Sequence, residues 1–253
     1  MKFDDVAPLL LGVPFMAREQ GRRLYEHLRT TRARDVLDIG TANGCSAAYM
    51  AAALDENGGG CVTTVDTPAV ARHPSAAEIL DRVGLRHLVR FVLVEDSSYT
   101  WWLKDQVEAH SDQAGNCTPI FDFCYLDGAH NWTIDGLSAL LCEKLLRPGG
   151  WLLLDDIYWT YAGHETAPGQ GPDDLHLSAA ERSVPHVEAV FNLVVKQHPA
   201  FTRFLVEDDE WGWAQKAPDQ PRRFELATTT SLKALLIRSL RRTKRAVAPQ
   251  AAR

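Results

Sequence analysis

Two short apolar runs that each end in acidic residues constrain the fold more than any other feature of this chain. Residues 121–126 are followed by Asp127, and residues 151–154 are followed by Asp155 and Asp156. A helix-like segment and a Pro-Gly-Gly break separate the two runs. A strand, a helix and a strand in this order form a βαβ unit with parallel strands that are buried on both faces. The pattern therefore predicts an α/β fold with these acids at the carboxyl edge of the sheet, where open α/β sheets bind ligands.

Three carboxylates at one sheet edge predict a metal site. Asp127, Asp155 and Asp156 would repel one another and lose hydration, and a hard divalent cation with oxygen ligands offsets both costs. The alternative is that Asp127 caps the following helix while the other two are solvated loop acids. Successive strand residues point to opposite faces, so Asp155 and Asp156 can both bind a cation only if the chain is already turning there. We favour the metal interpretation.

A glycine-bearing turn and a later acid predict an adenosine ligand. Residues 36–44 read VLDIGTANG, between a predicted strand and a helix predicted to begin just after Gly44. Such a turn brings backbone N–H groups and a helix N-terminus close to a ligand. The next predicted strand, residues 61–65, ends at Asp66, where an acid can accept both hydroxyls of a ribose. The fingerprint GxGxxG is absent, and this pattern does not separate NAD from S-adenosylmethionine.

The remaining elements complete a strand-rich α/β pattern. A third strand is predicted over residues 87–94 and ends in Glu95-Asp96-Ser97, which suits an adenine amino group, although acids in loops are common. Trp101 and Trp102 begin the next predicted helix and are expected in the core. The aromatic and glycine-bearing loop of residues 157–176 is either a substrate lid or a connector. Two final strands, separated by a Glu-Asp-Asp-Glu turn, predict a hairpin.

Composition indicates one large globular α/β domain. The chain has 253 residues, of which 45% are hydrophobic and 24% charged, as in ordinary globular proteins. The N-terminus carries acids where a signal peptide needs basic residues, so we expect a cytoplasmic protein. The five cysteines form no close pair, which indicates buried thiols rather than metal ligands or disulfides.

Charge is distributed unevenly along the chain. The net charge is −6, but residues 226–253 contain seven basic residues and no acid, so the rest carries −6 − 7 = −13. An acidic body argues against a nucleic-acid partner. Leu232, Leu235, Leu236 and Leu240 recur at helical spacing in the basic tail, which predicts a helix that supports a homodimer or docks on the body. We expect membrane contact to be a minor alternative because the apolar face is thin.

The order of predicted elements over roughly residues 16–216 resembles the class I S-adenosylmethionine-dependent methyltransferases. DIGTANGCSAAYMA is similar to the methionine-binding motif of the magnesium-dependent, catechol O-methyltransferase-like branch, with Ala42 in place of the middle glycine of the commoner motif. LDGAH and LLRPGGWLLLDD are similar to the metal motifs of that branch, in which the second acid of the final pair is often Asn. The closest resemblance is to bacterial O-methyltransferases that modify sugars or natural products. It implies a Rossmann-like, seven-stranded, mostly parallel sheet with helices on both faces and a C-terminal antiparallel hairpin.

The resemblance implies a role for each motif residue. Asp127, Asp155 and Asp156 would bind Mg²⁺ or Mn²⁺. His130 stands where the catechol enzymes carry a general-base lysine, and a neutral imidazole can do the same work. A fourth metal ligand or a hydrogen bond to the helix start are the alternatives for His130, and His164 is the competing base. The residues implied for S-adenosylmethionine are Gly40, Thr41, Gly44, Ser46, Asp66, Asp96, Ser97 and Asp127, and the candidates for substrate contact are Trp132, Trp159, Tyr161 and His164.

These inferences predict three parts of the chain and one leading function. Residues 1–31 form a helical cap, residues 32–217 a methyltransferase domain, and residues 226–253 a basic amphipathic tail. The expected reaction is metal-dependent methyl transfer to a hydroxyl of a sugar or related natural product. The alternatives are the same chemistry on a catechol or phenol, and a non-catalytic adenosine-binding module.

Overall fold

A seven-stranded sheet forms the centre of the computed structural model, with strand order β3-β2-β1-β4-β5-β7-β6. The structure describes residues 1–68, 72–95, 98–163 and 177–218. Strands β1 to β5 are mutually parallel, while β7 runs antiparallel to both β5 and β6. The strands are β1 (Asp35–Ile39), β2 (Cys61–Asp66), β3 (Val89–Leu93), β4 (Phe121–Leu126), β5 (Leu146–Leu154), β6 (Phe201–Glu207) and β7 (Trp211–Lys216).

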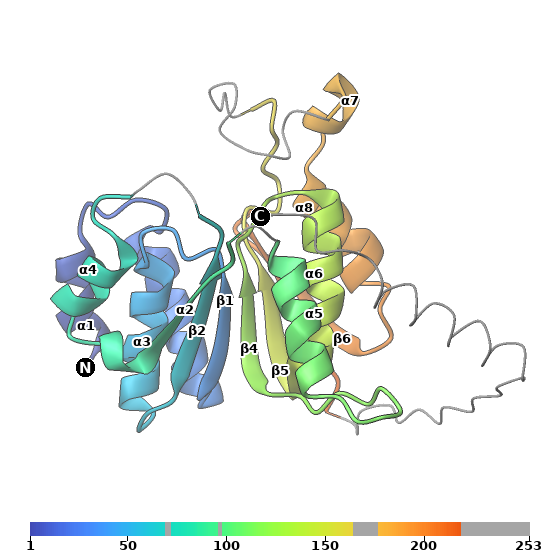
Figure 1. The fold of residues 1–253 in the computed structure, drawn as a ribbon. Helices are drawn as coiled ribbons and strands as arrows, with labels where there is room; N and C mark the ends of the chain where they lie inside the picture. The colour runs from blue at the N-terminus through green and yellow to red at the C-terminus, as the bar shows by residue number, and fades with distance from the viewer. Residues whose placement is uncertain (69–71, 96–97, 164–176, 219–253) are drawn as a thin grey trace, which may run out of the picture.

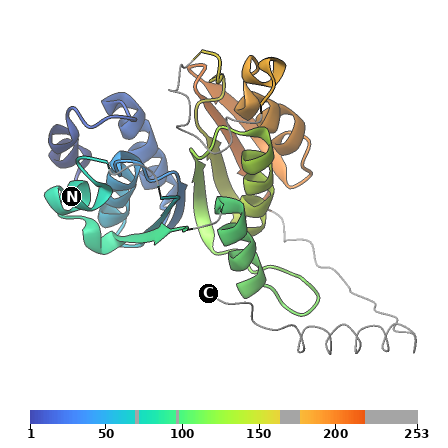
Figure 2. The same cartoon turned by 45° about the horizontal axis from the view of Figure 1, so that its top comes forward.

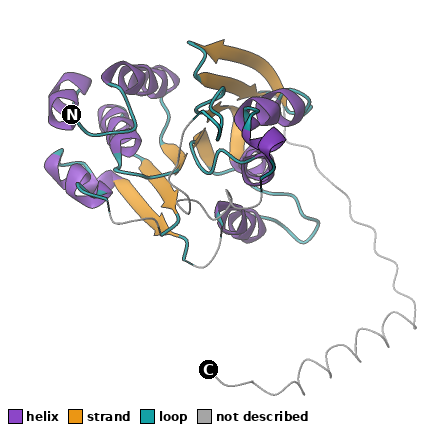
Figure 3. Cartoon of the chain, turned by 90° about the horizontal axis from the view of Figure 1, so that it is seen from above, coloured by secondary structure: helices purple, strands orange, loops and turns teal. Residues whose placement is uncertain are grey.

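Helices cover both faces of the sheet, which confirms the predicted fold class (Figure 1). One face carries α1 (Phe3–Val6), η1 (Ala7–Leu10), α2 (Arg18–Thr31), α3 (Cys45–Glu56), α4 (Ala76–Arg82) and the short turn η2 (Arg86–Leu88). The other carries α5 (Tyr99–Ala109), α6 (Trp132–Leu145), α8 (His186–Val190) and the π-helical turn η4 (Phe191–Val195). The four-residue helix α7 (Ala179–Arg182) contributes no buried residue. A tilted view (Figure 2) and a view from above (Figure 3) both show the strands between the two helical layers.

Each helical layer has its own hydrophobic core. Leu24, Leu28 and Met50 are fully buried on the face of α2 and α3, while Leu103 and Leu145 are fully buried on the face of α5 and α6. Helix α2 approaches α3 so closely that a Cβ atom on Gly21 would lie 2.2 Å from the Tyr49 ring. The N-terminal cap is therefore part of the core, although it is divided into three helical pieces rather than one.

Three local predictions are wrong in detail. The Pro-Gly-Gly break lies inside β5, because the strand already pairs with β4 at Leu146 before a register shift. His87 lies in the turn η2, so the third strand starts two residues later than expected. Trp101 is 59% exposed instead of buried, and its ring lies 4.7 Å from the Lys104 ammonium on the surface of α5.

The described residues include all five cysteines but not the predicted basic tail. The basic tail of residues 226–253 lies outside the described residues. In the part of the chain that the structure describes, no helix has the length and apolar character needed to cross a membrane. All five cysteines are free; Cys45, Cys124 and Cys142 are buried, whereas Cys61 and Cys117 are partly exposed.

Candidate active site

The glycine turn after β1 packs directly on the end of β4. Gly40 has a φ of 102°, and a Cβ atom at this position would lie 1.7 Å from the backbone oxygen of Asp127. Gly44 precedes α3 with a φ of 79°, and its Cβ would lie 2.8 Å from the Cβ of Ala76. Only glycine combines these backbone angles with such close neighbours. The turn thus brings the first strand end against the strand end that carries Asp127.

A buried carboxyl group supports the turn from behind. Asp38 accepts hydrogen bonds from the Thr64 hydroxyl at 2.7 Å and the Ser46 hydroxyl at 3.3 Å. Thr41 shares a hydrogen bond of 2.6 Å with Thr64. Burial raises the pKa of Asp38 to about 7. The side chains of Thr41 and Ser46, predicted to contact the cofactor, therefore also brace the turn.

The end of β2 carries Asp66 beside the glycine turn. Its carboxylate accepts the backbone N–H groups of Ala42 at 2.9 Å and Thr67 at 2.8 Å. Both bonds hold the acid at the rim of a cavity that Arg72 and Tyr99 also line. This is where an adenosine ribose was expected. Asp96 and Ser97, predicted for the adenine end, lie outside the described residues.

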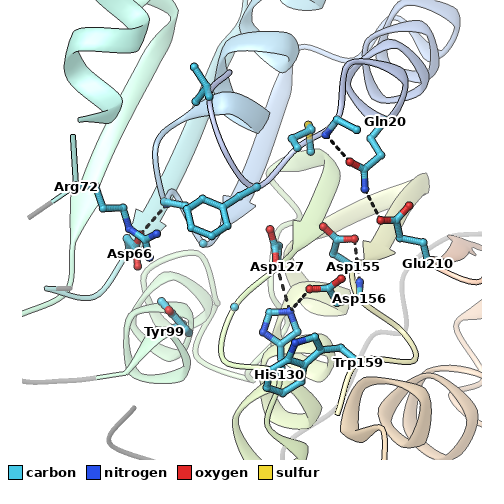
Figure 4. Close-up of a pocket in the computed structure, with 17 residues that line it drawn as sticks. Gln20, Asp66, Arg72, Tyr99, Asp127, His130, Asp155, Asp156, Trp159 and Glu210 are labelled. Carbon is cyan, nitrogen blue, oxygen red and sulfur yellow. Dashed lines mark hydrogen bonds and ion pairs between the residues drawn. The ribbon is translucent and has the colours of Figure 1, made fainter. Parts of the chain in front are cut away.

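Two of the three predicted metal ligands converge on His130. The Nε2 atom of His130 lies 3.1 Å from Asp156 Oδ2 and 3.5 Å from Asp127 Oδ1 (Figure 4). Asp156 has a φ of 53°, so the chain is already turning at the second acid of the pair. This geometry removes the objection that Asp155 and Asp156 must point to opposite faces. Asn131, not Asp127, caps α6, because its side chain accepts the N–H of Thr133 at 2.9 Å.

Asp155 is the most enclosed of the three acids. It accepts hydrogen bonds from the Tyr125 hydroxyl and from Trp211 Nε1, the latter at 2.6 Å. Burial, and then the charge of Asp156, raise the pKa of Asp155 to about 6. Its orientation is therefore determined by two aromatic residues of neighbouring strands.

Glu210 joins this group from the turn between β6 and β7. Oxygens of Asp155, Asp156 and Glu210 lie within 4.8 Å of one another, as do the ligand atoms of Asp127, His130 and Asp156. Nothing in the local sequence singled out Glu210 beyond its place in an acidic hairpin turn. The hairpin brings it to the site because β7 pairs with β5, whose end carries the two other acids.

The electrostatics of the group favour a cation. Burial, and next the charge of Asp155, raise the pKa of Asp127 well above its ordinary value, although His130 opposes this rise. For His130, burial disfavours protonation, but the interactions with Asp156 and Asp127 outweigh it and raise the pKa to about 9. The carboxylates thus draw positive charge to this point. With no other cation beside these carboxylates, the raised pKa means that His130 carries the positive charge as an imidazolium.

One cavity of about 770 Å³ joins the glycine turn to the acidic group (Figure 4). Trp159 lines it, with its ring centre 5.0 Å from that of His130. Tyr161 is buried behind Trp159, and its hydroxyl donates to the backbone oxygen of Ala129 at 3.0 Å. Trp132 is 42% exposed and is not among the cavity-lining residues. His164, the competing base, lies outside the described residues.

The strand order, the antiparallel β7 and a cavity at the carboxyl edge of β1, β2, β4 and β5 define the class I methyltransferase fold. The family model described as a methyltransferase domain matches residues 37–157. Residues 37–157 therefore match a methyltransferase domain, and the fold of the chain is that of solved O-methyltransferases. The resemblance to class I S-adenosylmethionine-dependent methyltransferases is confirmed at the level of this domain and the fold. A search of curated protein sequences finds no significant match.

Solved structures with the same fold are distant in sequence. The O-methyltransferase TomG from Streptomyces achromogenes, involved in tomaymycin synthesis and solved with S-adenosylmethionine, is 21% identical with a TM-score of 0.55, over 85% of this chain and 89% of that one. An O-methyltransferase from Bacillus cereus in complex with S-adenosylhomocysteine is 20% identical with a TM-score of 0.57, over 84% and 90%. At this identity the likeness concerns the fold.

Proposed function

We propose that the protein is a divalent-metal-dependent O-methyltransferase that transfers the methyl group of S-adenosylmethionine to a hydroxyl of a sugar or related natural product. The observation that carries this proposal is the single cavity that joins the Gly40 turn and Asp66 to Asp127, His130 and Asp156. An adenosine-binding module without catalysis would have no use for a convergent acidic group beside its ligand. The ligand-bound neighbours of the fold support the choice of cofactor.

The acidic residues fit a hard divalent cation. Their donor atoms are carboxylate oxygens, which suit Mg²⁺ or Mn²⁺. Burial, followed by mutual repulsion, raises the pKa of Asp127 and Asp155, and a bound cation would offset both effects. Asp127 and Asp156 would be the principal ligands, with Asp155 held in place by Tyr125 and Trp211. A bound cation would lower the pKa of the acceptor hydroxyl.

His130 is the proposed general base. Its Nε2 atom lies 3.5 Å from Asp127 Oδ1 and 3.1 Å from Asp156 Oδ2, so it would lie close to an acceptor hydroxyl that binds the same cation. The imidazole can remove a proton only when it is neutral, and the paired carboxylates hold it protonated. Neutralisation of Asp127 and Asp156 by another positive charge would therefore release His130 for this role. The S-adenosylmethionine sulfonium would supply the methyl group in line with the acceptor oxygen.

The cavity wall supports a small hydroxylated acceptor. Trp159 presents an aromatic surface next to His130, and Asp127 and Asp156 line the same cavity. An aromatic ring with neighbouring carboxylates can hold the apolar face of a sugar and its hydroxyls. A catechol would use the same elements, and it remains the alternative acceptor class.

Calorimetry and a methyl-transfer assay test this proposal. The protein should bind S-adenosylhomocysteine and not NAD, and Asp66→Ala should weaken binding by about 1.5–3 kcal/mol, the range for a hydrogen bond to a charged group. Glu108→Ala, on α5 and outside the cavity lining, is the control. Methyl transfer to a panel of glycosides and catechols should require Mg²⁺ or Mn²⁺. Full turnover in excess EDTA, or tight NAD binding alone, would refute the proposal.

We also infer a cytoplasmic homodimer in which the tail of residues 226–253 supports the interface or docks on the acidic body. The support is the charge of +7 on the tail against −13 on the rest. Truncation after Glu225 should leave cofactor binding intact and shift the oligomeric state in light scattering. An unchanged state, together with sedimentation of the full chain on anionic liposomes, would favour a membrane role instead.

A further inference from the structure

The segment between η1 and α2, residues 11–17, covers the cavity; we name it the roof. Val13, Phe15, Met16 and Ala17 all line the cavity. Where Phe15 and Met16 lie against the glycine turn, only a small cavity of about 10 Å³ remains. A ligand of the glycine turn would therefore lie beneath the roof. Movement of the roof would therefore open a path for that ligand over the turn.

The roof is held in a strained conformation. Phe15 has a φ of 75°, a backbone conformation that is rare and strained for a bulky side chain. Its side chain is 63% exposed, so burial in the core does not explain this conformation. The Arg72 guanidinium lies 4.9 Å from the centre of the Phe15 ring and contributes one attachment. Such strain persists only where other contacts hold the segment.

A glutamine supplies the second attachment, on the opposite side of the cavity. The Nε2 of Gln20 donates to Glu210 Oε1 at 2.5 Å, across 190 residues of sequence. The Oε1 of the same side chain accepts the backbone N–H of Ala17, the last residue of the roof, at 2.6 Å. Figure 4 shows Gln20 and Glu210 side by side at the edge of the cavity. One amide group therefore joins the roof to the hairpin turn.

The surroundings of Glu210 disfavour a second carboxylate at position 20. Its carboxylate lies near Asp155 and Asp156, and burial raises its pKa, with Asp156 adding to the rise. Arg23, the nearby cation, lies 3.8 Å from Glu207 and also pairs with Asp208. An amide can donate to Glu210 without adding charge, whereas a carboxylate at position 20 would be repelled. Glutamine suits this position because its amide supplies a donor for Glu210 and an acceptor for the Ala17 N–H.

We propose that Gln20 and Glu210 form a latch that holds the roof closed over the cofactor, and that release of this latch is the step by which cofactor and product exchange. This inference rests on the proposed function for the identity of the ligand. Gln20 and Glu210 are positioning residues in this role. The latch itself is a property of the free protein.

Arg18 provides a natural reporter of roof opening. It is the first residue of α2, directly after the roof, and its side chain is 59% exposed. Trypsin cleaves after Arg18 only when this junction opens, so the cleavage rate in the absence of any ligand measures the latch. Gln20→Glu keeps the acceptor for the Ala17 N–H but sets two carboxylates against each other. Glu26→Gln, an exposed residue of α2 that lies away from the cleaved bond, is the matched control.

Gln20→Glu should raise the rate of cleavage after Arg18 and the dissociation rate of S-adenosylhomocysteine by about tenfold each, the ratio expected for one lost hydrogen bond to a charged group. Glu26→Gln should change neither rate. The double variant Gln20→Glu/Glu210→Gln recreates the bond with donor and acceptor exchanged, and it should restore both rates. This rescue separates the latch from a general loss of folding.

Equal cleavage of wild type and Gln20→Glu would overturn the latch, as would a double variant that stays as fast as the single one. A latch that behaves as expected in proteolysis, in a protein that binds no S-adenosylhomocysteine, would support the latch and refute the proposed function. The two inferences therefore fail separately.

Discussion

The backbone oxygen of Asp127 occupies the space that a side chain on Gly40 would need, at 1.7 Å from the ideal Cβ position. The first and fourth strands, neighbours in the sheet, meet at this point, because Asp127 N donates to the Ile39 oxygen at 2.9 Å. The proposed cofactor turn and the proposed metal strand are thus joined through backbone atoms. A change at Gly40 would therefore disturb both sites at once.

Gly40→Ala should abolish cofactor binding and destabilise the fold by more than the roughly 1–3 kcal/mol of a strained backbone, since it adds a clash with Asp127. Gly58→Ala is the control, because Gly58 also has a positive φ of 90° but has no atom within 4 Å of an added Cβ. Chemical denaturation and calorimetry measure the two variants. If both variants lose the same stability and the same affinity for the cofactor, the contact with Asp127 is unimportant.

Magnesium should stabilise the wild-type protein against heat if the acids bind it. At a concentration one hundred times the dissociation constant, ligand binding contributes about 2.7 kcal/mol. Asp127→Asn and Asp156→Asn should each abolish this gain, while Asp209→Asn, an exposed acid of the same hairpin turn as Glu210, should keep it. A magnesium response that survives both substitutions would exclude these acids as ligands.

His130→Ala should lower kcat by about 10²–10⁴ and leave the affinity for S-adenosylhomocysteine unchanged, as expected for loss of a general base. The exposed His87, replaced by Gln, serves as the control. Loss of magnesium binding in His130→Ala would instead identify His130 as a ligand. If neither kcat nor metal binding changes, His164 becomes the residue to replace.

His27 should make the fold sensitive to acid. Burial lowers its pKa from 6.5 to about 4, and its ring packs against Phe123, Trp151 and Trp213. Between these two values the unfolded chain binds a proton that the folded chain does not. The contribution of the neutral His27 to the free energy of unfolding is therefore fully present above pH 6.5. It is lost, by up to about 1.4 kcal/mol per pH unit, as the pH drops toward 4.

Denaturation of His27→Gln between pH 7 and 4.5 measures this contribution as the difference from wild type, since other groups titrate in both proteins. The variant should lose less stability than the wild type on acidification. His87→Gln should follow the wild type. Parallel pH curves for His27→Gln and wild type would contradict the assignment.

Much of the fold and of the candidate site was predictable from local sequence. Parallel strands align their carboxyl ends, so acids that follow buried strands must meet at one edge. This reasoning predicts Asp66, Asp127 and Asp156 at one edge of the sheet, and in the structure all three line one cavity. The C-terminal hairpin and the helices on both faces follow from periodicity and from turn residues in the same way.

Only the tertiary structure decided which side chains face the cavity. Gln20 and Glu210 meet across 190 residues, and no local pattern encodes such a contact. Trp101 and Trp132 are exposed despite their size, because helix packing determines which helical face is covered. The sequence determined which chemical groups stand at the strand ends, through rules that act over a few residues. The roof and the latch depend on the path of the N-terminal segment across the finished sheet, which long-range packing alone decides.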